Sequence, residues 1–380
     1  MDFSISTEQE MLLRSVDRFM EKHLPAEEVR RRDDEHDPPY QLLPLMAELG
    51  ILALPFPREY GGLEAGWDTV ALVQERLGYR GHMAASMFNR VVGFGGMSLL
   101  AYGSAGQKER LLPRVIRGEL LFALALSEPE AGSDAASVRT RATRVEGGWR
   151  ITGRKSWTSD AQAANYLVTA CRTKPESAGA DGISMFLVPR ESDGLFMTEL
   201  EKIGNNCLPS WDVAFEEVFV PDEALMGQEN QGFKHVLSTL RYARASLAAS
   251  VTGQAQAAVD LALAHAKARQ QFGRPIGKFQ VIQHMLADMQ TRVDLSRLLV
   301  YYLADRIKSG QPCRKEAAQA KLVATEALQF VTDRGMQIMA SAGYSRDNDM
   351  QRYWRDGRLY SFGEGTNEIQ RNIIAKELGL

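Results

Sequence analysis

The chain has 380 residues, of which 44% are hydrophobic and 24% are charged, and its formal net charge is −3. This composition is typical of a globular protein with room for two or three hydrophobic cores, and the lack of a positive excess argues against nucleic acid or an anionic membrane surface as the main partner. The three cysteines form no CxxC pair and the six histidines show no HxxxH or HxH spacing, so we expect reduced thiols, a cytoplasmic location and no metal site. We expect neither a signal peptide nor a membrane span, because the first 20 residues carry both charge signs and no run of about 18 uncharged apolar residues occurs.

The hydrophobic period divides the chain into three regions in the order helix, strand, helix. Residues 1–119 have a helical pattern that is broken by Pro and Gly turns. Residues 120–225 contain short apolar or alternating runs between turn signals, which indicates an all-β domain, either a small barrel or a sandwich. The predicted strands are LLFALAL (120–126), WRITG (149–153), YLVTAC (166–171), ISMFLV (183–188) and VAFEEVFV (213–220).

Residues 226–380 return to the helical period, and the segment 245–266 is rich in small residues. Small side chains allow helix backbones to approach closely, so we expect tight helix packing there. The fold class is therefore α+β and multidomain. One helical face is marked by Leu286, Met289, Val293, Val300 and Leu303, and another by Leu328, Val331, Gly335, Ile338 and Ala342.

Two segments rich in small residues are candidates for ligand contacts. The segment GFGGMS (93–98) lacks the third glycine of a dinucleotide fingerprint and lies in a helix-like region, so we do not interpret it as a nucleotide site. The segment LALSEPEAGSD (124–134) follows an apolar strand and brings backbone N–H groups and two serine hydroxyls into a turn that suits a polar ligand. An ordinary β-turn containing Pro explains the second segment equally well.

Five motifs together resemble the acyl-CoA dehydrogenases, in the order and spacing of that family and over the whole chain. The resemblance implies an N-terminal α-helical domain (1–119), a middle β-barrel domain (120–225) and a C-terminal four-helix bundle (226–380). It also implies an oxidoreductase of fatty acid metabolism that uses FAD, assembled as a homotetramer or homodimer. The motifs are SEPEAGSD (127–134), GRKSWTSDA (153–161), ARQQFGRPIGKFQ (268–280), MQIMASAGY (336–344) and FGEGTNEIQR (362–371).

Carried over position by position, the resemblance implies two groups of FAD-binding residues. One group holds the isoalloxazine ring, and Ser127 and Ser159 within it stand where relatives commonly have Thr, which keeps the hydroxyl. In the other group, Arg269 matches an arginine that binds the FAD pyrophosphate across a subunit interface, an anion that suits a bidentate guanidinium. The implied set is Ala125, Leu126, Ser127, Trp157, Thr158, Ser159, Arg269, Phe272, Gln280, Gln337 and Thr366.

One part of this FAD site departs from the family pattern. The Gly-Gly pair that usually follows the glutamine at 337 is Ala340-Ser341 here. Those glycines permit close approach of the FAD phosphates. Either a shift of the backbone or a hydrogen bond from the Ser341 hydroxyl is then needed, and the sequence does not choose between them.

Glu364 lies in the turn GEGTN (363–367), at the position of the family's catalytic base. Taken alone, a Glu in a Gly-rich turn is a solvated carboxylate. The full set of motifs implies instead that Glu364 removes the α-proton of a thioester while flavin N5 accepts the β-hydride, which yields a trans-2-enoyl thioester. We expect burial beside an apolar acyl chain to raise the carboxyl pKa from about 4.3 toward neutrality. The resemblance also implies that the Glu364 backbone N–H and a flavin ribityl hydroxyl stabilise the developing enolate. We expect Asn367 and Gln370 to cap the helix that follows.

The substrate-binding residues implied by the resemblance are Ser133, Arg244 and Gly365. Some relatives place the base directly before the arginine at 244, but Ala243 cannot act as a base, which leaves Glu364. Relatives often carry Asp where this chain has Arg241, so the contacts to the carrier differ, and the thioester is one of CoA or of acyl carrier protein. Several straight-chain enzymes have Tyr where this chain has Gly363, which predicts a pocket for branched or ring-bearing acyl groups.

Four alternatives share this sequence evidence. An enoyl-CoA reductase or an acyl-thioester oxidase keeps the fold and changes the direction of the reaction or the electron acceptor, for which the resemblance implies electron-transfer flavoprotein. A flavin monooxygenase is disfavoured because it does not need the Glu. A non-catalytic scaffold protein is the alternative from a different functional class.

Overall fold

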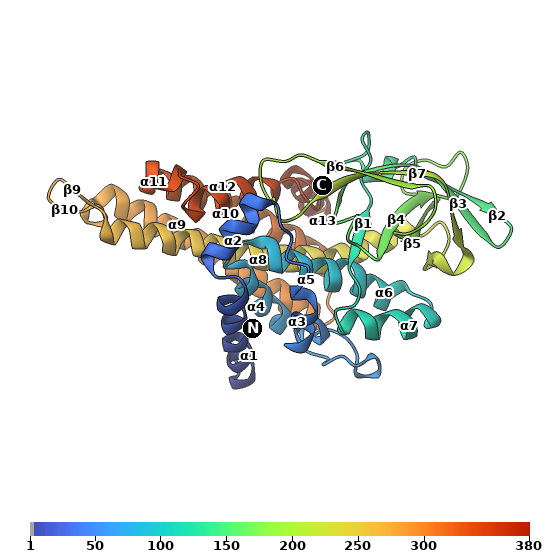
Figure 1. Ribbon diagram of the computed structural model, residues 1–380, viewed down its shortest axis with the longest axis horizontal. Helices are drawn as coiled ribbons and strands as arrows, with labels where there is room; N and C mark the ends of the chain where they lie inside the picture. The colour runs from blue at the N-terminus through green and yellow to red at the C-terminus, as the bar shows by residue number, and fades with distance from the viewer. Residues whose placement is uncertain (1–3) are drawn as a thin grey trace.

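The computed structural model describes residues 4–380 and confirms the order helix, β-sheet, helix (Figure 1). Capping boxes open two of the N-terminal helices, with Ser6 and Gln9 at α1 and with Ser104 and Gln107 at α7. The N-terminal region comprises α1 (Thr7–His23), α2 (Ala26–Glu35), α3 (Leu42–Glu48), η1 (Ile51–Ala53), η2 (Arg58–Tyr60), α4 (Trp67–Gly78), α5 (His82–Phe88), the π-helix η3 (Asn89–Gly96), α6 (Met97–Tyr102) and α7 (Ala105–Ile116).

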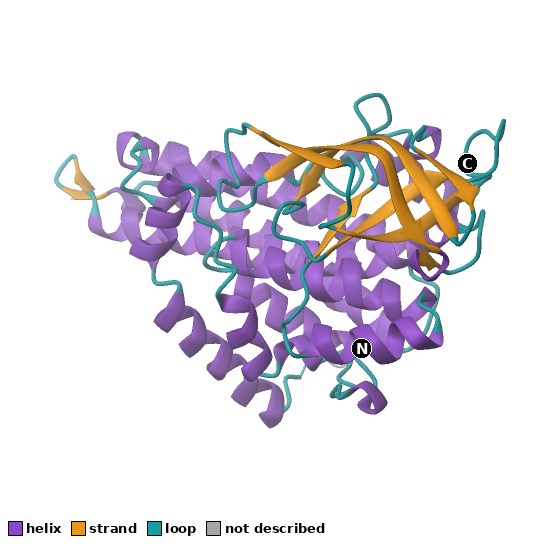
Figure 2. Cartoon of the chain, turned by 45° about the vertical axis from the view of Figure 1, so that its right-hand side comes forward, coloured by secondary structure: helices purple, strands orange, loops and turns teal. Residues whose placement is uncertain are grey.

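The middle region is a curled mixed sheet (Figure 2). Its hydrogen-bonded path runs β6-β7-β3-β2-β4-β5-β8, and β1 pairs in parallel with β4, so within residues 4–380 the outer strands β6 and β8 are not joined. The sequence reveals five of these strands but not β2, β6 or β8, which alternate weakly or are very short. The strands are β1 (Phe122–Ala125), β2 (Arg141–Val145), β3 (Gly148–Ser159), β4 (Tyr166–Arg172), β5 (Ile183–Pro189), β6 (Leu195–Leu200), β7 (Ser210–Pro221) and β8 (Leu225–Met226).

The C-terminal region contains three long helices that pack on one another, with α13 packed against α10. A two-stranded hairpin, β9–β10, joins α8 to α9 and projects from one end of the molecule (Figure 1). The elements are α8 (Gly232–Ala268), β9 (Gln270–Gln271), β10 (Arg274–Pro275), α9 (Gln280–Lys308), α10 (Arg314–Met339), α11 (Ser341–Tyr344), α12 (Asp349–Leu359) and α13 (Asn367–Glu377), with short 3-10 turns η4 (Ala135–Ser137), η5 (Asp222–Ala224) and η6 (Ile276–Lys278).

The predicted helical faces are buried with two exceptions. Leu286 is only half-buried. Ala342 is exposed, and placing it on the α10 face was wrong, because α10 ends at Met339 and the chain changes direction at Ala340.

The close packing predicted for 245–266 is confirmed where α8 crosses α4. A Cβ atom added to Gly253 would lie 2.0 Å from the Glu75 carbonyl oxygen, and one added to Gly78 would lie 2.0 Å from the Ser250 carbonyl oxygen. Neither position therefore admits a side chain. The glycines of the segment 93–98 likewise serve packing, since a Cβ on Gly95 lies 2.1 Å from the Phe122 ring. The contact between α4 and α8 thus depends on glycine on both helices.

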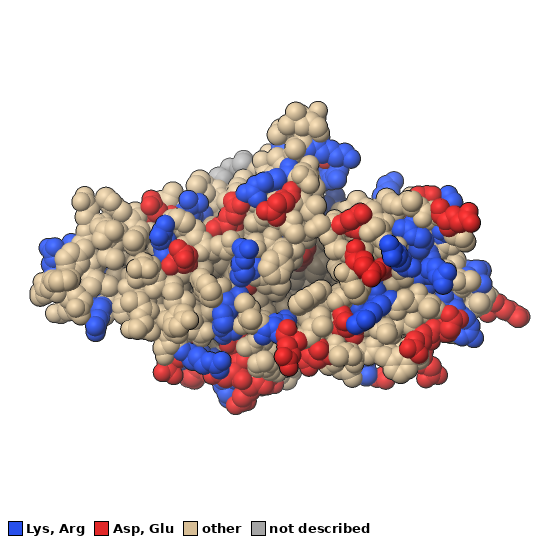
Figure 3. Space-filling view, turned by 90° about the horizontal axis from the view of Figure 1, so that it is seen from above, with Lys and Arg blue, Asp and Glu red and all other residues tan. Residues whose placement is uncertain are grey.

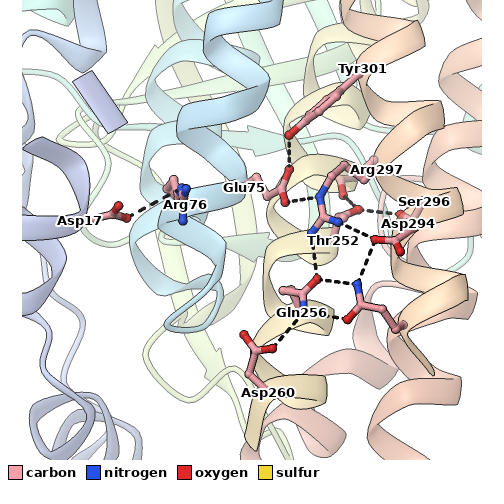
Figure 4. Close-up of polar contacts among 12 residues, drawn as sticks. Asp17, Glu75, Arg76, Thr252, Gln256, Asp260, Asp294, Ser296, Arg297 and Tyr301 are labelled. Carbon is pink, nitrogen blue, oxygen red and sulfur yellow. Dashed lines mark hydrogen bonds and ion pairs between the residues drawn. The ribbon is translucent and has the colours of Figure 1, made fainter. Parts of the chain in front are cut away.

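A polar seam runs between α4, α8 and α9 (Figure 4). Glu75 accepts from Arg297 Nε at 2.8 Å and from the Tyr301 hydroxyl at 2.9 Å. Arg297 also donates to Gln256 at 3.0 Å. We call Glu75, Gln256, Arg297 and Tyr301 the polar seam.

Among residues 4–380, none of the helices is both long and apolar enough to cross a membrane.

Candidate active site

The Glu364 turn connects α12 to α13 and has a left-handed backbone. Glu364 has φ +56°, a left-handed conformation that is uncommon for residues other than glycine, and Gly365 has φ +90°. Thr366, not Asn367, caps α13, because the Thr366 hydroxyl accepts from the Ile369 N–H at 3.2 Å. The predicted Asn367–Gln370 cap is therefore wrong, and both side chains are buried beneath the turn instead.

Three side chains from three helices fix the backbone of this turn. Arg244 of α8 donates from Nε and Nη2 to the Glu364 carbonyl oxygen, both at 3.4 Å. Lys321 of α10 donates to the Gly365 carbonyl oxygen at 2.9 Å, and Gln370 of α13 donates to the same oxygen at 2.9 Å. These contacts hold the strained turn in place. The hydrogen bonds of Arg244 and Lys321 go to the backbone of the turn and not to the Glu364 carboxyl group.

The Glu364 carboxyl group itself has little support. Asn89 Nδ2 donates to Oε1 at 3.2 Å, whereas Oε2 is buried and has no hydrogen-bond partner in residues 4–380. Burial raises the pKa of Glu364 to about 7, against the opposing charges of Arg244 and Lys321 and the Asn89 hydrogen bond. Burial also lowers the pKa of Lys321 to about 8. A carboxyl group that titrates near neutrality is suited to general-base chemistry.

The loop after β1 is anchored by a buried ion pair that the sequence did not reveal. Lys155 is fully buried and donates to Glu128 at 2.8 Å and to the Leu126 carbonyl oxygen at 3.1 Å. Glu128 also accepts from the Arg139 N–H at 2.7 Å and the Thr140 N–H at 2.9 Å. The segment Ala125-Leu126-Ser127 is thereby fixed against β3, where the Ser156 N–H donates to the Ser127 carbonyl oxygen at 2.9 Å.

A bulge in β3 presents the indole of Trp157 to solvent. The register between β3 and β7 shifts between Lys155 and Thr158, and Trp157 has φ +58° and is 57% exposed. Thr158 Oγ1 is buried and has no hydrogen-bond partner in the described part of the chain, and Ser159 is half-buried beside it. An exposed aromatic ring on a strained bulge, next to two hydroxyl-bearing residues and the fixed segment 125–127, fits the flat and polar-edged ring of a flavin.

The structure does not bring the second group of predicted FAD-binding residues to this place. Arg269, Phe272, Gln280 and Gln337 are all exposed, and Phe272 is 93% exposed at the tip of the β9–β10 hairpin. Arg269 ends α8 about seven turns beyond Arg244, which is about 37 Å at the helical rise. Ser133 is also exposed, in the loop that follows Glu128.

Ala340 keeps the backbone conformation of a glycine. Its φ of +48° and ψ of −132° follow directly on the last residue of α10. The backbone therefore does not shift to suit the alanine that replaces the family's glycine. Ala340 holds a conformation that costs an L residue about 1–3 kcal/mol. Ser341 is exposed at the start of α11.

Sequence reasoning missed Asn89, Glu128, Lys155 and Lys321. Glu128 and Lys155 lie inside two of the quoted motifs, where a charged residue next to an apolar strand is a signal for a buried ion pair. Asn89 and Lys321 lie far from any motif, and only the packing of η3 and α10 around the Glu364 turn reveals them.

Comparison with known proteins identifies the class of the chain. Family models for the acyl-CoA dehydrogenase N-terminal, middle and C-terminal domains match residues 6–119, 123–218 and 230–379. A probable acyl-CoA dehydrogenase of Bacillus subtilis is 37% identical over all of both chains, and a 3-(aryl)acrylate reductase of Clostridium sporogenes is 37% identical over 98% of this chain and 99% of the relative. The butyryl-CoA dehydrogenase of Megasphaera elsdenii superposes with a TM-score of 0.96 over all of both chains, at 31% identity.

The chain therefore belongs to the acyl-CoA dehydrogenase family, and it is an oxidoreductase that uses FAD. This confirms the resemblance, the fold class, the enzyme class and the cofactor expected from the sequence.

Proposed function

We propose that this enzyme dehydrogenates an acyl thioester between its α and β carbons, with Glu364 as the catalytic base. The observation that carries the proposal is the position of the Glu364 carboxyl group: its Oε2 is buried and has no hydrogen-bond partner among residues 4–380, and burial raises its pKa to about 7. A solvated turn carboxylate has none of these properties. The product is the trans-2-enoyl thioester.

The residues of the Glu364 turn supply the proton transfer and its stabilisation. The unpartnered Oε2 takes the α-proton. Within residues 4–380, no acceptor is hydrogen-bonded to the Glu364 backbone N–H, so this donor is available to the thioester oxygen, where negative charge develops. Arg244 and Lys321 keep the turn rigid, so that this N–H need not reorganise during the reaction.

Bound FAD supplies the acceptor for the β-hydride. Residues 125–127 and 157–159 would hold the ring, Arg269, Phe272, Gln280 and Gln337 would hold the pyrophosphate and adenosine end, and Thr366 is a further proposed FAD contact. The distance between the two groups supports an arrangement in which the hairpin of one subunit completes the FAD site of another.

A homotetramer agrees with the surface at the hairpin end of the molecule. Figure 3 shows that this end is mostly uncharged, whereas charged side chains gather over the β domain. Phe272, Val281, Leu295 and Leu298 on the hairpin and α9 are exposed apolar residues.

The free and buried cysteines suit a reducing compartment such as the cytoplasm. Electron-transfer flavoprotein is the proposed acceptor, and fatty acid metabolism is the proposed setting.

The substrate is proposed to be a CoA or acyl-carrier-protein thioester with a branched or ring-bearing acyl group. A Cβ on Gly363 meets only the Leu359 carbonyl oxygen, at 3.5 Å, so the side chain missing here leaves space unfilled. Ser133, Arg244 and Gly365 remain the proposed substrate contacts. Rates on a panel of linear and branched acyl-CoAs test this, and a clear preference for linear chains contradicts it.

Anaerobic titration of the FAD-loaded enzyme with acyl-CoAs tests the function. The flavin absorbance should bleach with the wild-type enzyme, and Glu364→Gln should bind FAD and ligand yet bleach about 10²–10⁴-fold more slowly. Glu368→Gln is the matched control, because Glu368 is exposed one turn further along and should bleach at the wild-type rate. Normal bleaching by Glu364→Gln means that another group is the base.

The second candidate is an enoyl-CoA reductase, and the 37% identity to a 3-(aryl)acrylate reductase favours it. The same active site serves both directions. The group that removes the α-proton in dehydrogenation returns a proton to the α-carbon in reduction. Reduced enzyme mixed anaerobically with enoyl-CoA distinguishes the two, and rapid reoxidation by air indicates an oxidase instead.

A further inference from the structure

Asn89 is the one side chain in residues 4–380 that hydrogen-bonds to the Glu364 carboxylate. It opens the π-helix η3 and is 3% exposed, and its Nδ2 lies 3.2 Å from Oε1. Arg244 and Gln370 contact the carbonyl oxygen of Glu364 rather than its side chain. The orientation of the carboxyl group therefore depends on a neutral donor from the N-terminal region.

The fold makes room for this carboxamide. A Cβ on Gly93, one turn further along η3, lies 2.2 Å from Asn89 Oδ1, so any other residue at 93 displaces the Asn89 side chain. The same Cβ lies 3.5 Å from Ala243 Cα on α8. Asn89 and Gly93 thus form a matched pair in which the second residue creates the space for the first.

The helix that carries Asn89 is anchored next to it. Arg90 donates to the Ser86 hydroxyl at 2.7 Å and pairs with the buried Asp160 at 2.5 Å. The Tyr40 hydroxyl donates to the other oxygen of Asp160 at 2.7 Å. Asp160 directly follows Ser159, so the same anchor joins η3 to the bulge in β3. Asn89 is therefore held at a fixed place relative to both halves of the site, and π-helical turns of this kind often occur at functional sites.

We propose that Asn89 is a positioning residue for the reaction: it holds Oε1 of Glu364 and so reserves Oε2 as the oxygen that accepts the substrate proton. This inference rests on the proposed role of Glu364 as the base. A carboxyl group that has no hydrogen-bond partner rotates about its terminal torsion with little hindrance. A single donor on Oε1 removes that freedom and leaves one oxygen directed into the site.

The same hydrogen bond favours the ionised carboxylate. The charged groups that also act on Glu364 are Arg244 of α8 and Lys321 of α10. Glu368 of α13 acts on Lys321, and Arg314 of α10 acts on Arg244. Arg90 on η3 is paired with Asp160. The substitution Asn89→Leu keeps the branched shape of the side chain, removes the donor and leaves all of these charges in place.

The test is the pH profile of anaerobic flavin bleaching in Asn89→Leu. The apparent pKa of the base should rise by about one unit from its wild-type value near 7, so that bleaching falls about fivefold at pH 7 and recovers by pH 9. Asn372→Leu, at an exposed asparagine of α13, is the control and should keep the wild-type profile. Infrared difference spectra of the protonated Glu364 carboxyl, assigned by its loss in Glu364→Gln, should show the same shift without turnover.

Gly93→Ala provides an independent test, because it keeps the asparagine at position 89 but displaces its side chain. It should shift the profile in the same direction, and the double variant Asn89→Leu/Gly93→Ala should shift it no further than Asn89→Leu alone. If Asn89→Leu does not retain FAD, Gly93→Ala carries the test. Wild-type profiles and spectra in both variants overturn the positioning role, whereas normal bleaching by Glu364→Gln overturns the proposed function instead.

Discussion

Two carboxylates in the helical part of this enzyme have opposite surroundings. Glu75, in the polar seam, has both oxygens paired, one with Arg297 and the other with Tyr301 (Figure 4). Within the described residues 4–380, Glu364 has one neutral hydrogen bond at 3.2 Å and one oxygen without a hydrogen-bond partner. Two cations lie near Glu364 as well, but their hydrogen bonds go to the backbone of its turn. A carboxylate whose two oxygens both have hydrogen-bond partners stabilises the fold. A carboxylate in a rigid turn with one oxygen left unpaired can accept a proton from a substrate.

The difference predicts stability changes of opposite sign. Between about pH 4.5 and pH 7 the folded enzyme holds a proton on Glu364 that the unfolded chain has lost, so the free energy of unfolding falls as pH rises through this window. Glu364→Gln removes this cost, so its free energy of unfolding should exceed that of the wild type by about 3 kcal/mol at pH 8 and should equal it at pH 4.

Glu75→Gln should do the reverse. It leaves Asp294 as the remaining counterion of the Arg297 guanidinium and should lower the free energy of unfolding by about 1–3 kcal/mol, while bleaching per bound flavin stays normal. Urea unfolding of both variants at pH 4 and pH 8 measures the contrast. Destabilisation by both substitutions at pH 8 removes the distinction between the two carboxylates.

Lys321→Met sharpens the comparison by removing one cation from the Glu364 turn. The Gly365 carbonyl oxygen and Asn367 Oδ1 lose a donor, and the pKa of Glu364 should rise because a charge that lowers it is gone. Bleaching at pH 7 should fall about tenfold and recover in part as pH rises. Lys376→Met, at an exposed lysine of α13, is the control. An unchanged pH profile in Lys321→Met means that this cation acts only on the backbone.

Ala340→Gly gives the smallest expected effect, at the other end of the molecule. Glycine adopts the φ of +48° without strain, so the free energy of unfolding should rise by about 1 kcal/mol and FAD should be retained better on dilution. Ala342→Gly, two residues on in an exposed helical turn, should lower stability by about 0.5–1 kcal/mol. If both substitutions lower stability, Ala340 is not strained.

The order of the three regions could be read from the sequence, because the change from a period near 3.6 to a period near 2 and back is strong at residues 120 and 225. The strands β2, β6 and β8 could not, since β2 is largely polar, the residues of β6 do not alternate strictly between apolar and polar, and β8 has two residues. The end of α10 also escaped prediction, because Ala340 is a good helix former that here adopts a glycine conformation.

The motif at 362–371 pointed to Glu364, but its chemistry depends on residues that are distant in the chain. The Asn89–Glu364 contact joins positions 275 residues apart, and the Arg244 and Lys321 contacts join α8 and α10 to the same turn. Such contacts follow from packing rather than from local pattern. The capping of α13 was assigned one residue too late because Thr366 and Asn367 are both good capping residues, and Asn367 instead accepts from Lys321.

The pH dependence of anaerobic bleaching, measured in single turnover for the wild type and Glu364→Gln, tests the central claim most directly. The wild-type rate should rise through an apparent pKa of about 7 and level off above it, and the Glu364→Gln rate should be lower by orders of magnitude at every pH. A wild-type rate that is already at its plateau at pH 5, or a substituted enzyme that follows the wild-type profile, contradicts the assignment of an under-paired Glu364 as the base.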